Sequence, residues 1–493
     1  MGIIQKQGIQ NTIISYIGIL IGFLNLILIQ PFFLTPEEIG LTRVLFSFSS
    51  LVAVFLPLGI GSIIFRYFPK FRNETKGHHG FLGFMLLFPA AGLLVVTVIL
   101  FSLKGFFISK YIAQSALFTE YYDYVLPLSF LLGLINILTI YASSLFKTSF
   151  PALLNDVVGR LLTILVISAY FLHWININQF VFFFVFVYAI QLGCLIIYVF
   201  SIERPVFRID FVMVNKLNIK EMLQYGFLLA FASIAGLGLR YLDAIMIGKY
   251  MALSFVGIYT IASFIPAVLE APLNSIDKIA FSKIANALET NNRKEIEEIY
   301  FKSSKYLFLL GGLMFLGINI NIDSLLGFLP EVYHHGGTVV LIISIGTLFN
   351  LASGTNNSLI YTSEHYRVGA FLLIFLVVIA FINNMIFIPL YGIEGAALAT
   401  AISTILNSLI RFVFIWKKFN LQPYDSKTAM IALLIVICSA VNYLITKFEN
   451  PVFDIVLRSS FISLIYCTGV YFLNIVPEFH RYIPLINRNS KKE

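Results

Sequence analysis

Two stretches of the chain, LTPEEIGLTRVLFSF (Leu34–Phe48) and MALSFVGIYTIASF (Met251–Phe264), share one plan. Each joins two long apolar runs through a short turn and places a glycine, Gly40 or Gly257, early in the second run. The two glycines are 217 residues apart. A repeat at this spacing predicts that the chain contains a duplicated unit.

A second pair of segments supports the duplication. FKTSFPALL begins at Phe146 and IYTSEHYRV at Ile360, an offset of 214 residues. Both offsets are close to the length of six membrane-spanning segments. We therefore expect two like-oriented six-helix lobes, related by a pseudo-two-fold axis along the membrane normal, with two further helices at the C-terminal end.

The composition restricts the class of protein. Of 493 residues, 59% are hydrophobic and only 12% charged, whereas soluble domains carry about 25% charged residues. A soluble enzyme, a nucleic-acid binder and a disordered protein are therefore excluded, and a polytopic membrane protein remains. The three cysteines, Cys194, Cys438 and Cys467, lie in apolar runs and predict neither a disulfide nor a metal site.

A helix needs about 20 apolar residues to cross a bilayer. The runs do not alternate in polarity as strands of a membrane β-barrel would, so the fold class is all-α. Cutting the chain at turn residues and charge clusters predicts fourteen spans: 11–34, 42–65, 80–103, 122–145, 151–173, 179–201, 222–247, 253–276, 303–326, 337–361, 368–388, 392–416, 428–447 and 453–476.

Charge gives the orientation. Of the 33 lysines and arginines, 24 fall on alternate connections and in the two terminal segments, all on one side of the predicted membrane. Cytoplasmic loops carry the Lys/Arg excess, so both termini should be cytoplasmic, which agrees with an even number of spans. The polar segment 277–302 also predicts a short amphipathic cytoplasmic helix through Asn291–Glu298.

These elements predict five parts of the chain. They are an N-terminal six-helix lobe (1–201), a cytoplasmic linker (202–221), a C-terminal six-helix lobe (222–418), an extra pair of helices 13 and 14 (419–478) and a basic cytoplasmic tail (479–493).

The segment IPLYGIEGAALATAIS (Ile388–Ser403) resembles the signature of polysaccharide exporters in the multidrug/oligosaccharidyl-lipid/polysaccharide superfamily. Pro389 and Gly392 predict a tight turn, and the alanines after it give the next helix a small face for close packing. The segments Tyr16–Ser47 and Ile64–Phe71 look like the first helices of the same family.

The resemblance implies a function. Such proteins flip a lipid-linked oligosaccharide, commonly an undecaprenyl-pyrophosphate O-antigen or capsule unit, from the inner to the outer leaflet by alternating access of the two lobes. It implies a multi-pass protein of the bacterial inner membrane, serving polysaccharide or lipopolysaccharide synthesis beside other assembly proteins. We expect a monomer with no cofactor, no enzymatic activity and no nucleic-acid partner.

Ionisable side chains inside the spans are the candidate site residues, because charge in a bilayer is costly unless it is paired or faces a wet cavity. Asp156 and Arg160 share a face of helix 5, and Arg240 and Asp243 share a face of helix 7. Each pair is either a structural ion pair or an arginine that binds pyrophosphate, with an aspartate that orients it.

Helix 8 carries a polar stripe of Glu270, Asn274 and Asp277. We expect it to bind sugar hydroxyls or a coupling proton or sodium ion, although Asp277 could instead mark the cytoplasmic interface. Arg43, early in helix 2, either guards the outer end of the cleft or snorkels to the membrane surface.

The remaining polar residues suggest simpler roles. Arg411 and Arg458 are expected to act as anchors or partners for lipid phosphate. No Gly-rich phosphate loop, nucleophile elbow or zinc spacing occurs, which argues against nucleotide hydrolysis. Two alternatives to a flippase stay open: a multidrug or cation antiporter on the same fold, and a membrane-embedded glycan polymerase or glycosyltransferase.

Overall fold

The computed structural model describes residues 3–56, 63–64, 67–68, 71–72, 78–111, 115–202, 219–445 and 447–475. Within these residues all regular structure is helical, and no strand occurs. Contacts divide the chain into unit 1, Met1–Thr260 with Ile388–Ile393, and unit 2, Ile261–Phe387 with Glu394–Glu493. Nearly all of the predicted linker (202–221) and the whole predicted tail (479–493) lie outside the described residues, and the boundaries of the lobes stay a prediction.

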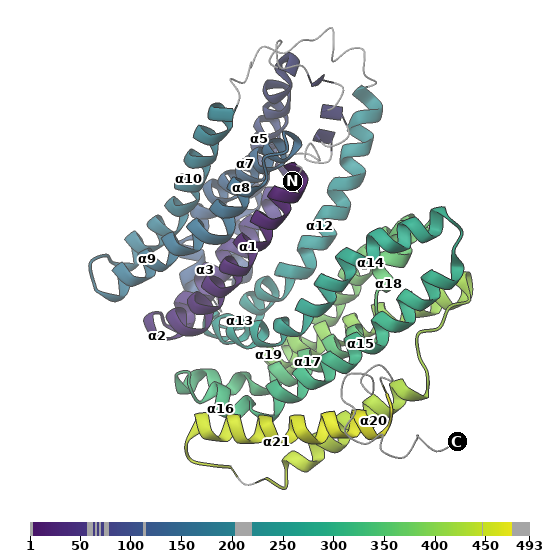
Figure 1. Cartoon of the computed structure of the whole chain (residues 1–493). Coiled ribbons are helices and arrows are strands. Elements are labelled where there is room, and N and C mark those ends of the chain that lie inside the picture. The colour runs from purple at the N-terminus through teal and green to yellow at the C-terminus, as the bar shows by residue number, and fades with distance from the viewer. Residues whose placement is uncertain are drawn as a thin grey trace, which may run out of the picture. The chain divides into compact units, whose positions relative to one another are not determined.

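Unit 1 is built from helices that run back and forth beside one another (Figure 1). Its elements are α1 (Ile3–Phe23), η1 (Leu24–Ile29), α2 (Gln30–Phe33), α3 (Pro36–Phe55), α5 (Phe81–Tyr111), α6 (Ala116–Glu120), η3 (Tyr122–Tyr124), α7 (Val125–Ser144), α8 (Ser149–Leu153), η4 (Leu154–Val158), α9 (Gly159–Phe171), α10 (Ile177–Ile202), α12 (Ile219–Tyr250) and most of α13 (Leu253–Ala267).

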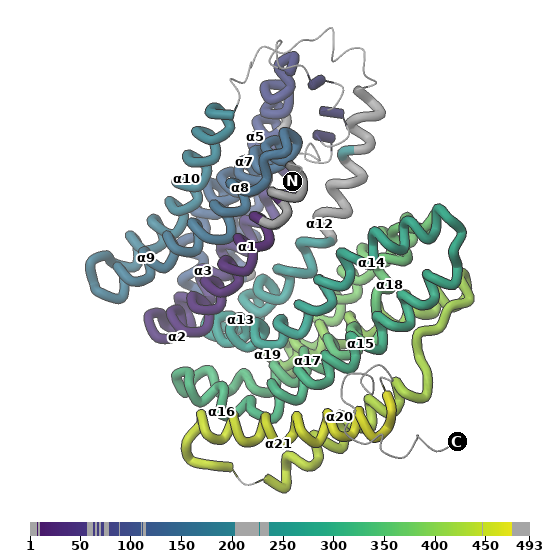
Figure 2. The backbone as a smooth tube through the Cα atoms, viewed as in Figure 1, coloured from purple at the N-terminus to yellow at the C-terminus, as the bar shows by residue number. Residues whose placement is uncertain are grey.

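Unit 2 begins within α13, and the regular structure of its described residues is also helical. Its elements are η5 (Val268–Glu270), α14 (Ala271–Glu289), α15 (Arg293–Ile320), α16 (Ile322–Leu326), η6 (Glu331–Gly336), α17 (Gly337–Ala352), α18 (Asn356–Thr362), most of α19 (Tyr366–Phe419), α20 (Ser426–Asn442) and α21 (Pro451–Phe472). The tube in Figure 2 shows α20 and α21 running beside each other, and both pack on α15.

The helices confirm a multi-pass membrane protein. Among the described residues, 11 helical segments are long and apolar enough to cross a bilayer, and α20 is a shorter apolar helix. One of the 11, Tyr366–Phe419, contains two predicted spans, and α12 covers another. Each of the fourteen predicted spans is therefore mainly helical in its described part, but span 303–326 is divided between α15 and α16, and span 337–361 between α17 and α18.

The turn predicted at Pro389 and Gly392 is confirmed. Gly392 has φ +61° and ψ −135°, and it is the non-helical residue at which α19 kinks. A positive φ is open to glycine at little cost because glycine lacks a Cβ. Beyond the kink the predicted small face is buried: a Cβ on Gly346 of α17 would lie 2.8 Å from Cα of Ala401. Small side chains thus let α17 and α19 approach closely, as helices in membranes require.

The prediction of a short amphipathic helix through Asn291–Glu298 was wrong, because this segment contains a turn and the start of a long helix. The α14 helix continues to Glu289, a turn follows with Asn291 at φ +52°, and α15 begins at Arg293. Asn292 caps α15, because its side chain accepts a hydrogen bond from the backbone N–H of Glu295 at 3.3 Å. Helices 8 and 9 therefore extend beyond their apolar parts and meet in a turn.

The role predicted for Arg458 was also wrong. Its side chain is only 3% exposed and pairs with Asp454 at 2.8 Å, rather than facing lipid phosphate. Its other nitrogens donate to Asn442 Oδ1 at 2.9 Å and to the carbonyl oxygen of Ile445 at 3.1 Å. Ser324 of α16 donates to Asp454 at 2.8 Å. Because every partner belongs to unit 2, this network fixes α20 and α21 to the rest of that unit.

Candidate substrate site

The repeated turns pack on each other in a reciprocal way. A Cβ on Gly40 of α3 would lie 1.9 Å from the carbonyl oxygen of Leu253, and a Cβ on Gly257 of α13 would lie 2.1 Å from that of Pro36. Adding the 217-residue offset to Pro36 and Gly40 gives Leu253 and Gly257. Gly40 of the first repeat therefore contacts Leu253, the equivalent of Pro36, and Gly257 contacts Pro36 itself. Such reciprocal contacts are expected when a two-fold axis relates α3 and α13.

Two arginines of unit 1 lie on α3 and α12, which pack on each other. Arg43 of α3 is half-buried, and Arg240 of α12 is exposed and close enough to interact with it electrostatically. Arg43 lies about 10 Å along its helix from Pro36, at 1.5 Å per residue, and Arg240 about 15 Å from Tyr250. Both cations therefore sit well inside the spans rather than at helix ends.

Aromatic rings form a wall next to Arg43. The guanidinium carbon of Arg43 lies 6.0 Å from the ring centre of Tyr241. Phe46 contacts Tyr241 edge-on at 5.9 Å and stacks on Tyr188 at 5.8 Å between ring centres. An arginine over an aromatic face gains a cation–π attraction that partly replaces its hydration.

Asp243 lies in the same cluster. Its Oδ2 accepts a hydrogen bond of 2.5 Å from Tyr259 of α13, and it interacts electrostatically with Arg43. Among the residues that the structure describes, neither Arg43 nor Arg240 makes a hydrogen bond or an ion pair. With two guanidinium groups and one carboxylate, this cluster, which we call the arginine cluster, has a net charge of +1. Its unused N–H donors suit an anionic group.

Asp156 and Arg160 form a separate pair against α1. As predicted, they share a face: a Cβ on Gly18 would lie 2.8 Å from Cβ of Asp156, and one on Gly22 would lie 2.0 Å from Nη1 of Arg160. Arg160 donates a hydrogen bond to the carbonyl oxygen of Gly18. Part of its donor capacity is thus used to hold α9 against α1.

The polar stripe of helix 8 is divided. Its three residues do not lie on one regular helix, because the 3₁₀ turn η5 ends at Glu270 and α14 begins at Ala271. Glu270 and Asn274 are exposed, whereas Asp277 is half-buried and lines a pocket of about 400 Å³ in unit 2. Of the eight candidate residues, the structure therefore brings Arg43, Arg240 and Asp243 together and Asp156 and Arg160 together.

Tyr188, Tyr241 and Tyr259 were not among the predicted site residues. One signal was available for Tyr188: interfacial tyrosines gather at span ends, whereas Tyr188 lies near the middle of α10. The proximity of these tyrosines to Arg43 results from the tertiary packing of their helices, which the sequence does not show.

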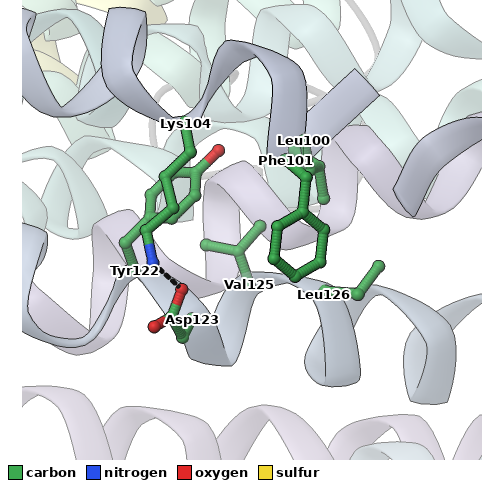
Figure 3. Close-up of a pocket in the computed structure, with 7 residues that line it drawn as sticks. All are labelled: Leu100, Phe101, Lys104, Tyr122, Asp123, Val125 and Leu126. Carbon is green, nitrogen blue, oxygen red and sulfur yellow. Dashed lines mark hydrogen bonds and ion pairs between the residues drawn. The ribbon is translucent and has the colours of Figure 1, made fainter. Parts of the chain in front are cut away.

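A second pocket, of about 150 Å³, lies between α5 and α7 (Figure 3). It is lined mainly by apolar side chains, and Lys104 pairs with Asp123 at its edge. This ion pair links α5 to the 3₁₀ turn η3 that precedes α7. In the described part of the chain, no three His, Cys, Asp or Glu side chains converge as a metal site would require.

Known proteins resemble this chain along most of its length. A family model described as "Polysaccharide biosynthesis protein" matches residues 32–321. An uncharacterized membrane protein of Methanocaldococcus jannaschii, MJ1068, is 23% identical over 89% of this chain and 88% of its own length. The probable flippase AglR of Haloferax volcanii is 25% identical over 38% of this chain and 39% of its own.

The fold has a solved counterpart. The lipid II flippase MurJ, in an inward closed conformation, superposes with a TM-score of 0.74 over 97% of this chain and 99% of its own, at 16% identity. At that identity the match shows the fold, which is the predicted all-helical one. Since the family model spans more than half of the residues, the chain belongs to the polysaccharide biosynthesis protein family, and its fold is similar to that of MurJ.

Proposed function

We propose that this protein moves a polyprenyl-diphosphate-linked oligosaccharide across the membrane, with the arginine cluster binding the diphosphate. The observation that carries the proposal is the pair Arg43 and Arg240, two guanidinium groups inside the spans with no hydrogen-bonded partner among the described residues. An undecaprenyl carrier in a bacterial inner membrane is one form of this substrate, and the archaeal relatives make other polyprenyl carriers equally compatible.

The mechanism follows from charge and solvation. A diphosphate entering the bilayer needs charge-assisted hydrogen bonds, and the planar guanidinium can bind it bidentately. Asp243, held by Tyr259, orients the arginines and competes with the diphosphate for them, which favours release. The saccharide needs a wet cavity, because stripping hydroxyls of water without replacement is costly. The polyprenyl tail stays in lipid while the two lobes alternate.

The other candidates have supporting roles in this proposal. Arg160 and Asn274 contact the headgroup at other stages of transport, and Asp156 and Glu270, with Asp243 and Asp277, are the carboxylates through which a proton or sodium gradient would act. Replacing each carboxylate by its amide and measuring flipping with and without an imposed ion gradient identifies the coupling residue. A gradient effect that persists in all four amide variants contradicts this assignment.

A multidrug antiporter is the second candidate. Such a carrier needs acidic groups in an otherwise apolar cavity to attract organic cations, whereas the arginine cluster is positive. We expect no uptake of labelled organic cations under a proton or sodium gradient. A glycan polymerase or glycosyltransferase is the third, and sugar incorporation into longer chains by purified protein would support it instead.

The cellular test is deletion of the gene. Lipid-linked oligosaccharide should accumulate on the inner leaflet, and the sugar that it carries identifies the pathway. Re-expression of the wild-type protein should clear it, whereas the Arg43→Ala, Arg240→Ala double variant should not. Unchanged distribution of the lipid-linked sugar after deletion contradicts the proposal.

A further inference from the structure

The 400 Å³ pocket of unit 2 lies between α14 and α18, apart from the arginine cluster of unit 1. This volume falls in the range of about 300–1,000 Å³ typical of small-molecule sites. Its lining combines charged, amide, hydroxyl and aromatic side chains: Asp277, Lys278, Phe281, Asn357, Ser358 and Tyr361. We call it the α14–α18 pocket.

A break in helix 10 creates one wall of this pocket. The predicted continuous span 337–361 is interrupted between α17 and α18, where Gly354 has φ +63°. Ser304 of α15 donates to the freed carbonyl oxygen of Ala352, and Ser303 bonds with Thr355 at 3.0 Å. Irregular backbone at membrane depth is tolerated where such partners exist, and broken helices of transporters commonly line substrate sites.

Asp277 offers a free acceptor in the pocket. Its Oδ1 accepts from Ser358 Oγ at 2.9 Å, while its Oδ2 has no hydrogen-bond partner among the described residues. Arg411 of α19 lies near enough to interact electrostatically with Asp277 and Tyr361. Arg411 is only 6% exposed and makes no hydrogen bond within the described part of the chain. The positive charge of Arg411 therefore offsets the negative charge of Asp277 without forming a hydrogen bond to its carboxylate.

Asn357 adds a second unsatisfied group. Its Oδ1 is buried and has no hydrogen-bond partner among the residues that the structure describes, and the residue lines the pocket. A buried amide oxygen without a partner costs about 1–3 kcal/mol. Rotation of the amide by 180° exchanges its oxygen and nitrogen and would present the oxygen to a ligand hydroxyl, which removes that cost.

Two aromatic rings complete the lining. Tyr361 is held in place, because its hydroxyl donates to the carbonyl oxygen of Gly369 at 3.0 Å and a Cβ on Gly369 would lie 2.8 Å from its ring. Phe281 of α14 is 47% exposed. Such rings give apolar faces against which the C–H side of a sugar ring can pack.

We propose that the α14–α18 pocket binds a sugar ring of the transported glycan. A phosphate is disfavoured there by Asp277, and a free cation is disfavoured by Arg411 and Lys278. A neutral polyhydroxyl compound meets acceptors in Asp277 and Asn357, a donor in Lys278 and apolar ring faces. The inference rests on the proposed function, since it assigns the glycan of the same substrate to unit 2 and its diphosphate to unit 1.

The test uses the full chain in lipid nanodiscs and saturation-transfer NMR with free sugars, so that no lipid carrier is involved. The probes are glucose, galactose, mannose and N-acetylglucosamine. We expect at least one to bind in the millimolar range, and Phe281→Ala and Asn357→Ala each to weaken it by about tenfold or more, since both remove a contact rather than a charge. Phe371→Ala, at a 65% exposed position of α19, is the matched control and should leave binding unchanged.

Two results overturn the inference: binding of no sugar, or sugar binding that both pocket variants leave intact. Displacement of the sugar by inorganic pyrophosphate would also overturn it, because it would make the pocket an anion site. The proposed function fails separately. If the wild type flips lipid-linked glycan but binds no free sugar, only this inference is lost, and if it binds sugar in the pocket without flipping, only the transport proposal is lost.

Discussion

At the scale of single residues, two glycines determine how closely the repeated helices approach. At Gly40 and at Gly257, a carbonyl oxygen of the other repeat occupies the space that a Cβ would need. Both glycines were recognisable in the sequence from their shared position after a turn. The arginine cluster was only partly predictable. Arg43, Arg240 and Asp243 stood out as charges in apolar runs, but their convergence depends on how α3, α12 and α13 pack.

Gly40→Ala and Gly257→Ala should have closely similar effects, because their contacts are equivalent. Each new Cβ would overlap a backbone oxygen, and overpacking costs about 1–3 kcal/mol. We expect each variant to unfold at a lower temperature in detergent than the wild type. Gly193→Ala of α10 is the control, since nothing lies within 4 Å of its added Cβ. A thermal midpoint in either variant equal to that of the control would rule out the reciprocal contact.

Arg458→Ala should destabilise the protein strongly. Removing one partner of a buried ion pair leaves the other charge uncompensated and costs about 3–5 kcal/mol. Lys302→Ala breaks an exposed pair of the same i, i+4 spacing with Glu298, and such pairs contribute about 0.3–0.5 kcal/mol. The measurement is the thermal unfolding midpoint of both variants. An equal decrease in the two midpoints would mean that Arg458 is not part of a buried ion-pair network.

At the scale of helices, sequence reasoning located each span but missed the irregularities within them. The break at Gly354 lies within Ser353–Ser358, a run of small and polar residues that the predicted span 337–361 nevertheless included. The serines of α15 that stabilise the break are distant in sequence. The turn at Asn291 was missed because the polar residues around it were assigned to a separate helix. The hydropathy of a segment predicts whether it spans the membrane. The positions of breaks and turns within a helix depend instead on particular hydrogen-bond partners.

Gly354→Ala should misplace α18. Its φ of +63° disfavours any side chain, and a Cβ would lie 2.9 Å from the backbone nitrogen of Ser304. We expect free-sugar binding in the α14–α18 pocket to weaken while binding of inorganic pyrophosphate at the arginine cluster stays unchanged. Equal weakening of both ligands would point to general unfolding, which contradicts a local role for the break.

The junction of α15 and α20 should respond to acid. Burial acts to raise the pKa of Asp425, but hydrogen bonds from Lys305, at 3.0 Å, and Thr428 outweigh it and hold that pKa below its usual value. A carboxyl with a lowered pKa stabilises the folded state above its unfolded pKa of about 3.9, and this stabilisation is lost as pH falls through the folded value. Asp425→Asn should therefore remove part of the stability loss that the wild type shows as the pH falls below about 4. A stability profile identical to the wild type would exclude this contribution.

At the scale of the whole molecule, the repeat and the exporter-like segment Ile388–Ser403 were sufficient to predict the family and fold that the comparisons confirm. They could not assign a chemical role to each lobe, because that depends on which polar side chains remain unpaired after folding. The structure separates two kinds of polar chemistry: Arg43 and Arg240 in unit 1, which make no hydrogen bond among the described residues, and an oxygen-rich pocket with aromatic rings in unit 2.

In the proposed function, Arg240 binds the diphosphate of the transported lipid. The direct test is flipping of a fluorescent polyprenyl-diphosphate-linked sugar in proteoliposomes by the wild type, by Arg240→Ala and by Arg367→Ala, which removes an exposed arginine near the start of α19. Arg240→Ala should insert and fold normally but flip about 10- to 100-fold more slowly, since a hydrogen bond to a charged group contributes about 1.5–3 kcal/mol, whereas Arg367→Ala should flip normally. Wild-type flipping by correctly folded Arg240→Ala would contradict the account.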